Sequence, residues 1–459
     1  MSGAIASHRG TRQVARAVVL LLGAAVIGGC AAKRPATVSP NEIPSLARRV
    51  AQNPTNADVV FRLSAALFAG GQCDSALVVA RKGMTLRPEA PVGPMIVGQC
   101  LERAGEWDQA LVVYRTYLTT FPEGSGSPSV RARQVLAQRD RANALARLAL
   151  EREAELAPQP TDPDIVAVLP VSIVGDPQYE PLSRGLAQIL TSDLALLQRF
   201  RMVERLQVVA LLDEMRLGGT NRVDPSTAAR VGRMLQAGRM VQGLAVIEVQ
   251  EETRFEASVV LSDGEVTAPA VQTGELERLL ELEKLVVIDI ANQLGYFLSE
   301  AELRLIFENG TQNLIAFLSY SRGLIAEDLG DYNAAALHYR EAVQADPAFQ
   351  AAREQYQATS VATAVQNAAP GAIVTVAAQP PPAPLPTVAT PSATTPPPVN
   401  PIASTVSDIA SIQAEQVAAT QTPVVTGTQT SAQDPPPTPT IQGTPVTLTG
   451  RIRIIFRLP

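Results

Sequence analysis

The sequence predicts a multidomain α+β protein, in which a central α/β domain is flanked by all-α helical hairpins and followed by a disordered tail. Three observations indicate this organisation. Small residues, glycine and proline recur with a period of 34 residues near the N-terminus. A block of alternating strand-like and helix-like segments follows. About half of the 36 prolines then lie between residues 358 and 446.

The first 29 residues have the layout of a secretory signal peptide. Three arginines and no acidic residue precede an apolar run that is too short to remain as a membrane helix. The run ends in Ile27-Gly28-Gly29-Cys30, which resembles the bacterial lipobox, whose cysteine receives diacylglycerol through its thiol. We therefore expect lipidation at Cys30, followed by an N-terminal tether over residues 30–50. Because residue 31 is Ala rather than Asp, the expected location is the outer membrane, facing the periplasm.

Residues 51–156 contain two copies of a helical-hairpin pattern and then a charged, alanine-rich helix. Small residues let paired helices cross closely, glycine permits the turn between them, and proline ends the second helix. This pattern resembles the tetratricopeptide repeat, and a third copy is predicted at residues 311–357. The glycine, alanine and proline of the three copies are Gly71, Ala76 and Pro88; Gly105, Ala110 and Pro122; and Gly330, Ala335 and Pro347.

The block at residues 162–300 has the pattern of an α/β domain. A continuous apolar run at residues 165–171 indicates a strand that is covered on both faces. Helices are expected after it, then strands at residues 239–249, 254–262 and 265–273, with a turn at Asp263-Gly264. A long helix from about residue 275 to 294 closes the unit. Its acidic residues Glu275, Glu277, Glu281 and Glu283 are predicted to form a solvated face.

This block resembles the curli-production assembly/transport family, whose domain is called CsgG-like, over roughly residues 165–295. The matching residues are Val166–Pro170, Leu182–Thr191, Val203–Arg205, Leu211–Met215, Leu217–Gly218, Asp224–Ala229, Leu235, Ala237, Val241 and Gly243. The resemblance implies an α/β sandwich related to the Tol N-terminal domain, commonly found in lipoproteins and without covalent chemistry. Glu204-Arg205 is accordingly interpreted as a fold-fixing ion pair or a helix start. Two positions depart from the family: Val171 replaces an aromatic residue and Gln236 replaces a glycine.

Composition argues against several classes of function. The formal net charge is −6, and removing residues 1–29 with their three arginines makes it about −9, which disfavours a nucleic-acid partner. The only histidines are His8, within the signal segment, and His338, within a repeat. Catalytic triads and ordinary zinc sites are therefore not expected. We predict no enzyme activity, no catalytic or metal-ligating residue, no cofactor and no small-molecule substrate.

Cys73 and Cys100 are the cysteines other than the expected lipidation site. Cys73 falls near the start of the second helix of the first repeat, and Cys100 near the end of the first helix of the next. Because adjacent helices in such arrays run antiparallel, the two ends should lie close enough for a disulfide. The alternative is a pair of buried thiols.

The chain from residue 358 to 445 is predicted to be a disordered linker rich in Pro, Thr and Ala. It ends in residues 446–459, where apolar residues alternate with Thr and Arg as in a β-strand. Such a strand must pair with a sheet edge, either within its own chain or on a partner.

The sequence thus favours a non-catalytic scaffold for assembly or secretion at the cell envelope. Its repeats would bind envelope proteins, and its central domain would dock or form a homo-oligomer. No residue is assigned to partner binding. The alternative is an oligomeric subunit of a curli-type outer-membrane secretion channel. That function requires added membrane-spanning strands of about 9–11 residues, whereas the links between the expected strands are short.

Overall fold

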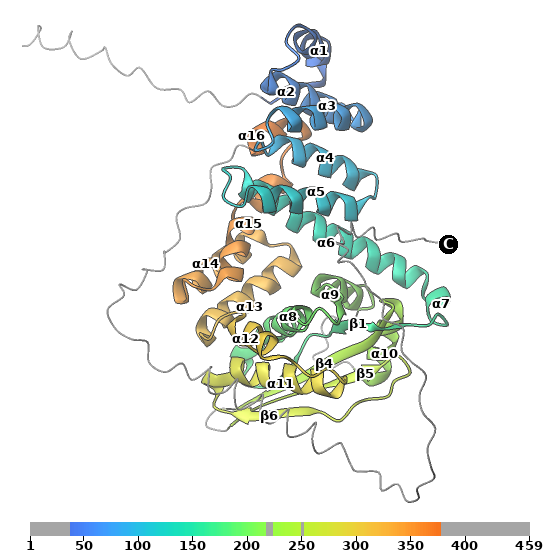
Figure 1. Ribbon diagram of the computed structural model, residues 1–459, viewed down its shortest axis with the longest axis vertical. Coiled ribbons are helices and arrows are strands. Elements are labelled where there is room, and N and C mark those ends of the chain that lie inside the picture. Colours follow the sequence, from blue (N-terminus) through green and yellow to red (C-terminus); the bar gives the residue numbers. More distant parts are fainter. Residues whose placement is uncertain (1–36, 217–223, 249–251, 378–459) are drawn as a thin grey trace, which may run out of the picture. The chain divides into compact units, whose positions relative to one another are not determined.

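The computed structural model of this chain describes residues 37–216, 224–248 and 252–377 (Figure 1). All of them belong to one compact unit. Within them, helical hairpins flank one mixed sheet of six strands, which confirms the predicted α+β class. Cys30 and the predicted strand at residues 446–459 lie outside the described residues.

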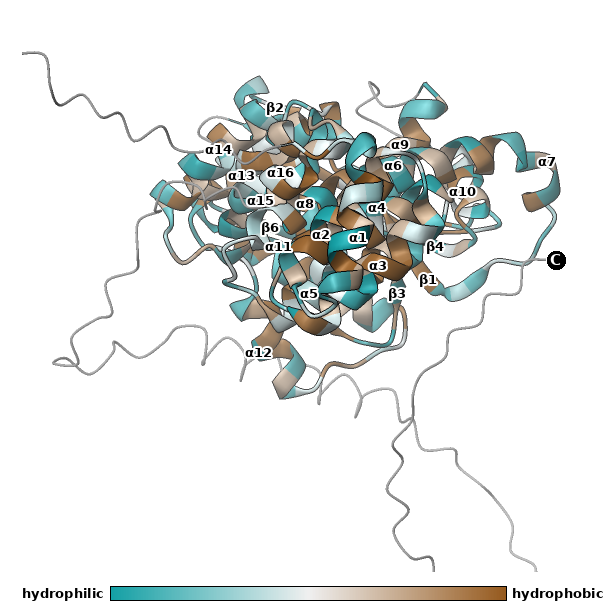
Figure 2. Cartoon of the chain, turned by 90° about the horizontal axis from the view of Figure 1, so that it is seen from above, coloured by the Kyte–Doolittle hydropathy of each residue, from teal (hydrophilic) through white to brown (hydrophobic). Residues whose placement is uncertain are grey.

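The N-terminal part consists of helices that pack on one another in sequence order, from α1 to α6. Their apolar side chains meet in a common core that includes Phe61, Phe68, Met95 and Ile96. Figure 2 shows apolar and polar stretches on the same helices, as packing on a core requires. The elements are η1 (Pro40–Glu42), α1 (Ile43–Gln52), α2 (Ala57–Ala69), α3 (Cys73–Leu86), α4 (Val92–Arg103), α5 (Trp107–Thr120), α6 (Ser127–Glu151) and α7 (Glu153–Leu156).

The turns within the hairpins lie at the glycines that the 34-residue spacing singled out. Gly71 joins α2 to α3 with φ 74°, Gly105 joins α4 to α5 with φ 77°, and Gly330 occupies the same place in the third repeat with φ 79°. This left-handed region is costly for residues with a Cβ atom. The predicted hairpin pattern is therefore confirmed by backbone conformation as well as by helix positions.

The sheet has the strand order β3-β1-β4-β5-β6, and β2 also pairs with β4. The pairs β1–β3, β1–β4 and β2–β4 are parallel, whereas β4–β5 and β5–β6 are antiparallel. The predicted turn is confirmed, with Gly264 at φ 93°. Val266 pairs with Val260 as an isolated bridge, but the regular last strand starts only at Ala270, five residues later than predicted and directly after Pro269, which has no N–H to donate. The strands are β1 (Asp162–Val168), β2 (Ser172–Gly175), β3 (Arg201–Met202), β4 (Ala237–Ile247), β5 (Thr253–Leu261) and β6 (Ala270–Gly274).

Helices cover both faces of the sheet. On one face, α8 (Leu182–Leu196) and α11 (Leu279–Gln293) share a core with the strands. On the other face, α9 (Arg205–Glu214) and α10 (Pro225–Met234) form a second, smaller core with β1, β4 and β5. The predicted buried strand is β1, whose Val166, Ala167 and Val168 are at most 1% exposed because both faces are covered.

The remaining helices return the chain from the α/β domain to the first repeats. In space, α13 packs on α8, α15 packs on α6, and α6 also packs on α9. The α/β domain is therefore inserted in sequence between helices that meet again in the folded chain. These elements are η2 (Pro177–Tyr179), η3 (Leu276–Arg278), α12 (Glu300–Glu308), α13 (Leu314–Leu329), α14 (Tyr332–Ala345), α15 (Gln350–Gln366), η4 (Pro370–Ala372) and α16 (Ile373–Ala377).

The predicted start of the disordered linker at residue 358 is too early. Helix α15 continues to Gln366, and α16 ends only at Ala377. Val361, Val365 and Val376 are buried in the core of the N-terminal repeats. These apolar residues have helical spacing, but they lie in a segment whose alanine and threonine content matches that of the sequence beyond it.

Candidate interaction site

The structure brings the two predicted cysteines together. Cys73 is the first residue of α3, and Cys100 lies in the last turn of α4. Their Cα atoms are 5.4 Å apart, and the sulfur atoms are joined as a disulfide with a sequence separation of 27. The Cα–Cα distance lies within the usual range for disulfides, so the bridge requires no backbone movement.

A tyrosine–glutamate pair is buried at the same place in two repeats. The Tyr114 hydroxyl donates to Glu102 at 2.6 Å, and the Tyr339 hydroxyl donates to Glu327 at 2.6 Å. In both repeats the residue four positions before the glutamate is a glycine, where a Cβ atom would overlap the tyrosine ring. The second and third repeats thus share an internal polar contact as well as a helix pattern.

The two glutamates differ in their charged neighbours. Glu102 accepts a hydrogen bond at 3.0 Å from Nε of Arg133, on α6. Burial raises the pKa of Glu327 to about 7, although the Tyr339 hydrogen bond and the charge of Arg205 both act to lower it. Glu327 is therefore partly protonated near neutral pH.

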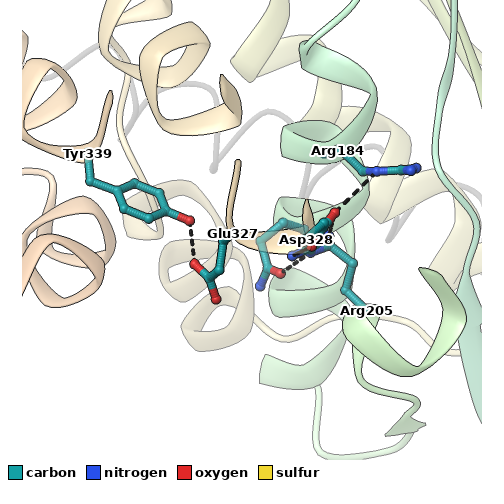
Figure 3. A network of polar contacts seen from close by, with 6 residues as sticks. Arg184, Arg205, Glu327, Asp328 and Tyr339 are labelled. Atoms are coloured by element: carbon teal, nitrogen blue, oxygen red, sulfur yellow. Dashed lines mark hydrogen bonds and ion pairs between the residues drawn. The ribbon is translucent and has the colours of Figure 1, made fainter. Parts of the chain in front are cut away.

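Next to Glu327, Asp328 joins the third repeat to the α/β domain (Figure 3). The Asp328 carboxylate accepts two hydrogen bonds from the Arg205 guanidinium, each of 2.8 Å. Nε of Arg184 lies 3.3 Å from the same carboxylate, and Nε of Arg205 donates to Gln188 at 3.1 Å. Burial acts to lower the pKa of Arg205, but the charge of Asp328, the hydrogen bonds to it and the charge of Glu327 together outweigh burial, so the net shift is upward.

Local structure explains how these groups meet. Arg205 is the first residue of α9, while Arg184 and Gln188 lie one turn apart on α8. Helix α13 approaches α8 closely at Gly185, where a Cβ atom would lie 2.0 Å from Oγ of Ser321. The absence of a side chain at this position lets α13 bring Asp328 to the two arginines.

The sequence had singled out Glu204-Arg205 as an ion pair or a helix start. The helix start is confirmed, and the fold-fixing ion pair joins Arg205 to Asp328 rather than to its neighbour. Glu204 instead lies 3.7 Å from Arg141. Asp328 is 123 residues away from Arg205, so no local pattern could have identified it.

A second charged cluster is buried between α8 and α11. Nζ of Lys284 lies 2.6 Å from Asp193 and 3.3 Å from Glu283, and all three side chains are fully buried. Nδ2 of Asn309 donates to Asp193 at 2.5 Å. Burial raises the pKa of Glu283 to about 8, and the nearby charge of Asp193 acts in the same direction, while Lys284 acts to lower it.

The prediction that Glu283 belongs to a solvated face is therefore wrong, whereas Glu275 and Glu277 are exposed. Glu283 and Lys284 lie in the middle of an apolar helix, between Leu282 and Leu285. An adjacent pair of opposite charges in such a run was the available signal for burial. The cluster holds α8 and α11 together inside the core.

A cleft of about 470 Å³ lies between α5, α6 and α15, where the first repeats meet the third. Its polar lining includes Arg115, Arg131, Gln134, Gln138 and Glu354, and Tyr320 of α13 also contributes. Nη2 of Arg131 donates to the Pro122 carbonyl at 3.0 Å, while its buried Nε has no hydrogen-bond partner among the described residues. No residue of this cleft was predicted, because its walls are more than 200 positions apart in sequence.

Metal-binding clusters and membrane-spanning helices are both absent from residues 37–216, 224–248 and 252–377. Within these ranges, no group of three or more His, Cys, Asp or Glu side chains is placed to hold a metal ion. Among the helices of the same ranges, none combines the length and apolar character needed to cross a bilayer.

Part of the α/β domain is similar to a known protein family. Residues 152–257 match the family model described as curli production assembly/transport component CsgG. The match covers the sheet from β1 to the middle of β5 and overlaps the domain that the sequence predicted. A comparison with curated proteins finds no match.

Two solved structures also align with parts of the chain. A crystal structure of a tetratricopeptide repeat protein from Parabacteroides merdae ATCC 43184 has 12% sequence identity and a TM-score of 0.20. The alignment covers 70% of this chain and 91% of the repeat protein's chain. The structure of Naa15/Naa10 bound to HypK-THB has 14% identity and a TM-score of 0.19, and covers 69% of this chain and 36% of its own. At these TM-scores, neither structure informs the arrangement of the whole chain.

Proposed function

We propose that this chain, which carries a CsgG-family domain between tetratricopeptide-like hairpins, is an outer-membrane lipoprotein that scaffolds assembly or secretion in the periplasm. The observation that carries the proposal is the cleft between α5, α6 and α15. Its walls come from both groups of repeats, and the third repeat is fixed to the α/β domain through Asp328 and Arg205. The protein acts by binding other proteins and performs no covalent chemistry.

The membrane anchor in this proposal is the lipid on Cys30. The basic, apolar and small-residue order before this cysteine supports it. Cys30→Ala removes the thiol that receives the lipid, so we expect an unprocessed form or a soluble periplasmic form in cell fractionation. Normal recovery of this variant with the outer membrane contradicts the anchor.

The partner of the cleft is an extended segment of an envelope protein that carries acidic side chains. Arg115 and Arg131 face the cleft together with a single carboxylate, Glu354. The positive charges of these two arginines favour carboxylates on the partner. Apolar contacts from Leu118, Val135 and Tyr320 supply burial for the partner side chains.

The test fills the cleft without touching the core. Ala351 is exposed on α15 and lines the cleft, so Ala351→Glu narrows it and adds a negative charge that repels an acidic partner. Ala364 is exposed on the same helix and is not among the lining residues, so Ala364→Glu is the matched control. We expect crosslinking of the intact lipoprotein in cells to lose its unlike partner only in Ala351→Glu. Equal crosslinking by the two variants contradicts the assignment.

The second candidate is an oligomeric subunit of a curli-type secretion channel, and the CsgG match is the observation that favours it. A channel subunit associates mainly with copies of itself. In that case Ala351→Glu leaves the assembly unchanged, and the complex extracted from membranes consists of equal copies.

A further inference from the structure

After the third repeat, the chain turns back and covers one face of the N-terminal repeats. Helix α15 ends at Gln366, and the short elements η4 and α16 follow within a few residues. The segment Pro370–Ala377 packs on α2 through η4, and on α2, α4 and α6 through α16. Figure 1 shows α16 beside α2 and α4, although more than 250 residues separate them in sequence.

The covered face is built from the first helices of successive hairpins. Helices α2 and α4 open the first two repeats, and α6 takes the next equivalent place. Each of these helices also contacts the next, α2 with α4 and α4 with α6, so they form one continuous surface. Stacked helical repeats expose such a surface for ligands. In this protein that surface carries a segment of its own chain.

The segment is held as a bound peptide would be. The Gly371 carbonyl accepts a hydrogen bond from the Val38 N–H at 2.9 Å, and the Val376 carbonyl accepts one from the buried Ser129 hydroxyl at 2.8 Å. Ile373, Val376 and Ala377 are buried against the repeats. A Cβ atom at position 371 would lie 2.2 Å from the Val38 oxygen, so the backbone contact at Gly371 requires glycine.

The chemistry of the segment defines what the face recognises. Residues 370–377 contain no charged side chain, and the buried anchors are two branched aliphatic residues and one alanine. One buried hydroxyl and one backbone N–H of the repeats pair with its carbonyls. The face therefore selects a short, uncharged segment with aliphatic and small anchor residues.

We infer that Pro370–Ala377 is an intramolecular ligand, and that the α2–α4–α6 face is a recognition site for short aliphatic segments that is occupied in cis. A segment of the same chemistry on another molecule binds there only when the cis segment has been released. Only Asn367–Ala369 separate the segment from α15, so its effective concentration at the face is high. This site is distinct from the cleft between α5, α6 and α15, and the inference goes beyond the proposed function.

The test releases the cis segment in the full chain and supplies it in trans. In the double variant Ile373→Asp/Val376→Asp, two buried aliphatic anchors become charged, so the segment leaves the face. The probe is a fluorescent synthetic peptide of residues 367–377, and its binding is followed by anisotropy. We expect the double variant to bind it at least tenfold more tightly than the parent chain. The matched control is Ala369→Asp, which places a charge at an exposed position and should behave like the parent. A peptide carrying Val376→Asp should not bind.

Equal binding of the probe by parent and double variant overturns the inference, as does absence of binding by a double variant that still melts cooperatively. If the double variant does not fold, Gly371→Ala provides the second test. Its Cβ atom disrupts the contact with Val38 without adding a charge, and we expect probe binding between that of the parent and that of a fully released chain. In the parent, hydrogen exchange at residues 373–377 should be as slow as in α2 and α4. Fast exchange there, as in a free chain, also overturns the inference.

Discussion

The Asp328 carboxylate on α13 and the Arg205 guanidinium on α9 share two hydrogen bonds of 2.8 Å, with both side chains less than a tenth exposed. The first residue belongs to the third repeat and the second to the CsgG-family domain. A buried pair of this geometry fixes the position of one element against another, because each charge is satisfied only when the other is in place.

Removing one partner of this pair leaves a buried charge. We predict that Asp328→Ala lowers the free energy of unfolding by about 3–5 kcal/mol, since Arg205 remains in the interior without its carboxylate. The control is Glu153→Ala, which breaks the more exposed pair between Glu153 and Arg230 and should cost under about 1 kcal/mol. Urea denaturation measures both. A loss in Asp328→Ala no larger than in the control would mean that the pair does not fix the junction.

Stability should depend on pH through Glu327. Burial raises the pKa of this carboxyl from its ordinary value of 4.5 to about 7. The folded state therefore binds more protons than the unfolded state between these values. The stabilisation is fully present below pH 4.5 and is lost as pH rises through about 7.

Glu327→Gln keeps a neutral side chain at every pH, so its stability should fall less than that of the parent between pH 5 and pH 7.5. The exposed Glu308→Gln serves as the control and should follow the parent. The measurement is the urea midpoint at several pH values. Parallel curves for parent and Glu327→Gln would be inconsistent with the proposed cause.

Gln236 lies in the left-handed region with φ 54°, just before β4. Glycine adopts this conformation without a steric cost, because it has no Cβ atom. A left-handed conformation costs a residue with a Cβ atom about 1–2 kcal/mol. Glycine avoids this cost, but its greater conformational entropy in the unfolded chain offsets part of the gain in stability. We predict that Gln236→Gly raises the free energy of unfolding by about 0.5–1 kcal/mol. Gln236→Ala retains the strain and should give no gain in the same denaturation experiment.

Gly185 allows α13 to approach α8. Its replacement by alanine would place a Cβ atom 2.0 Å from Oγ of Ser321 and 3.1 Å from the Phe317 ring. We predict that Gly185→Ala destabilises the protein by about 1–3 kcal/mol through overpacking. Ser321→Ala removes the nearer atom and should restore part of the loss, which a double-mutant cycle detects. Strict additivity of the two substitutions would show that this contact is not the cause.

The disulfide between Cys73 and Cys100 is testable on protein taken from the periplasm. We expect both cysteines to resist alkylation under denaturing, non-reducing conditions. Replacing both by serine should lower the free energy of unfolding by about 3 kcal/mol, because the bridge closes a loop of moderate length. Complete alkylation without reductant would show that both cysteines are free thiols.

Much of the fold follows from local pattern. The 34-residue spacing predicted the hairpins and their turn glycines, since helix crossing and helix ends depend on residues close in sequence. The apolar run at residues 165–171 predicted the buried strand β1. The burial of Glu283 could not be predicted in this way, because helical position alone does not reveal that it lies in the core beside Lys284, which pairs with Asp193.

The residues of the interaction sites were harder to predict from the sequence than the fold. Arg205 was noticed, but its partner Asp328 depends on how α13 crosses α8 after the inserted domain. The cleft and the covered face of the N-terminal repeats each require helices from opposite ends of the chain. The segment Pro370–Ala377 also resembles the proline- and alanine-rich sequence that follows it, so composition hid its packing.

The central claim is that the protein is a scaffold with an unlike partner at the outer membrane. The most direct measurement is the mass and composition of the intact complex, extracted from outer membranes in detergent and analysed by native mass spectrometry. The proposal predicts this chain together with a different protein in fixed stoichiometry, and loss of that protein in Ala351→Glu but not in Ala364→Glu. A ring of equal copies without an unlike protein would contradict it.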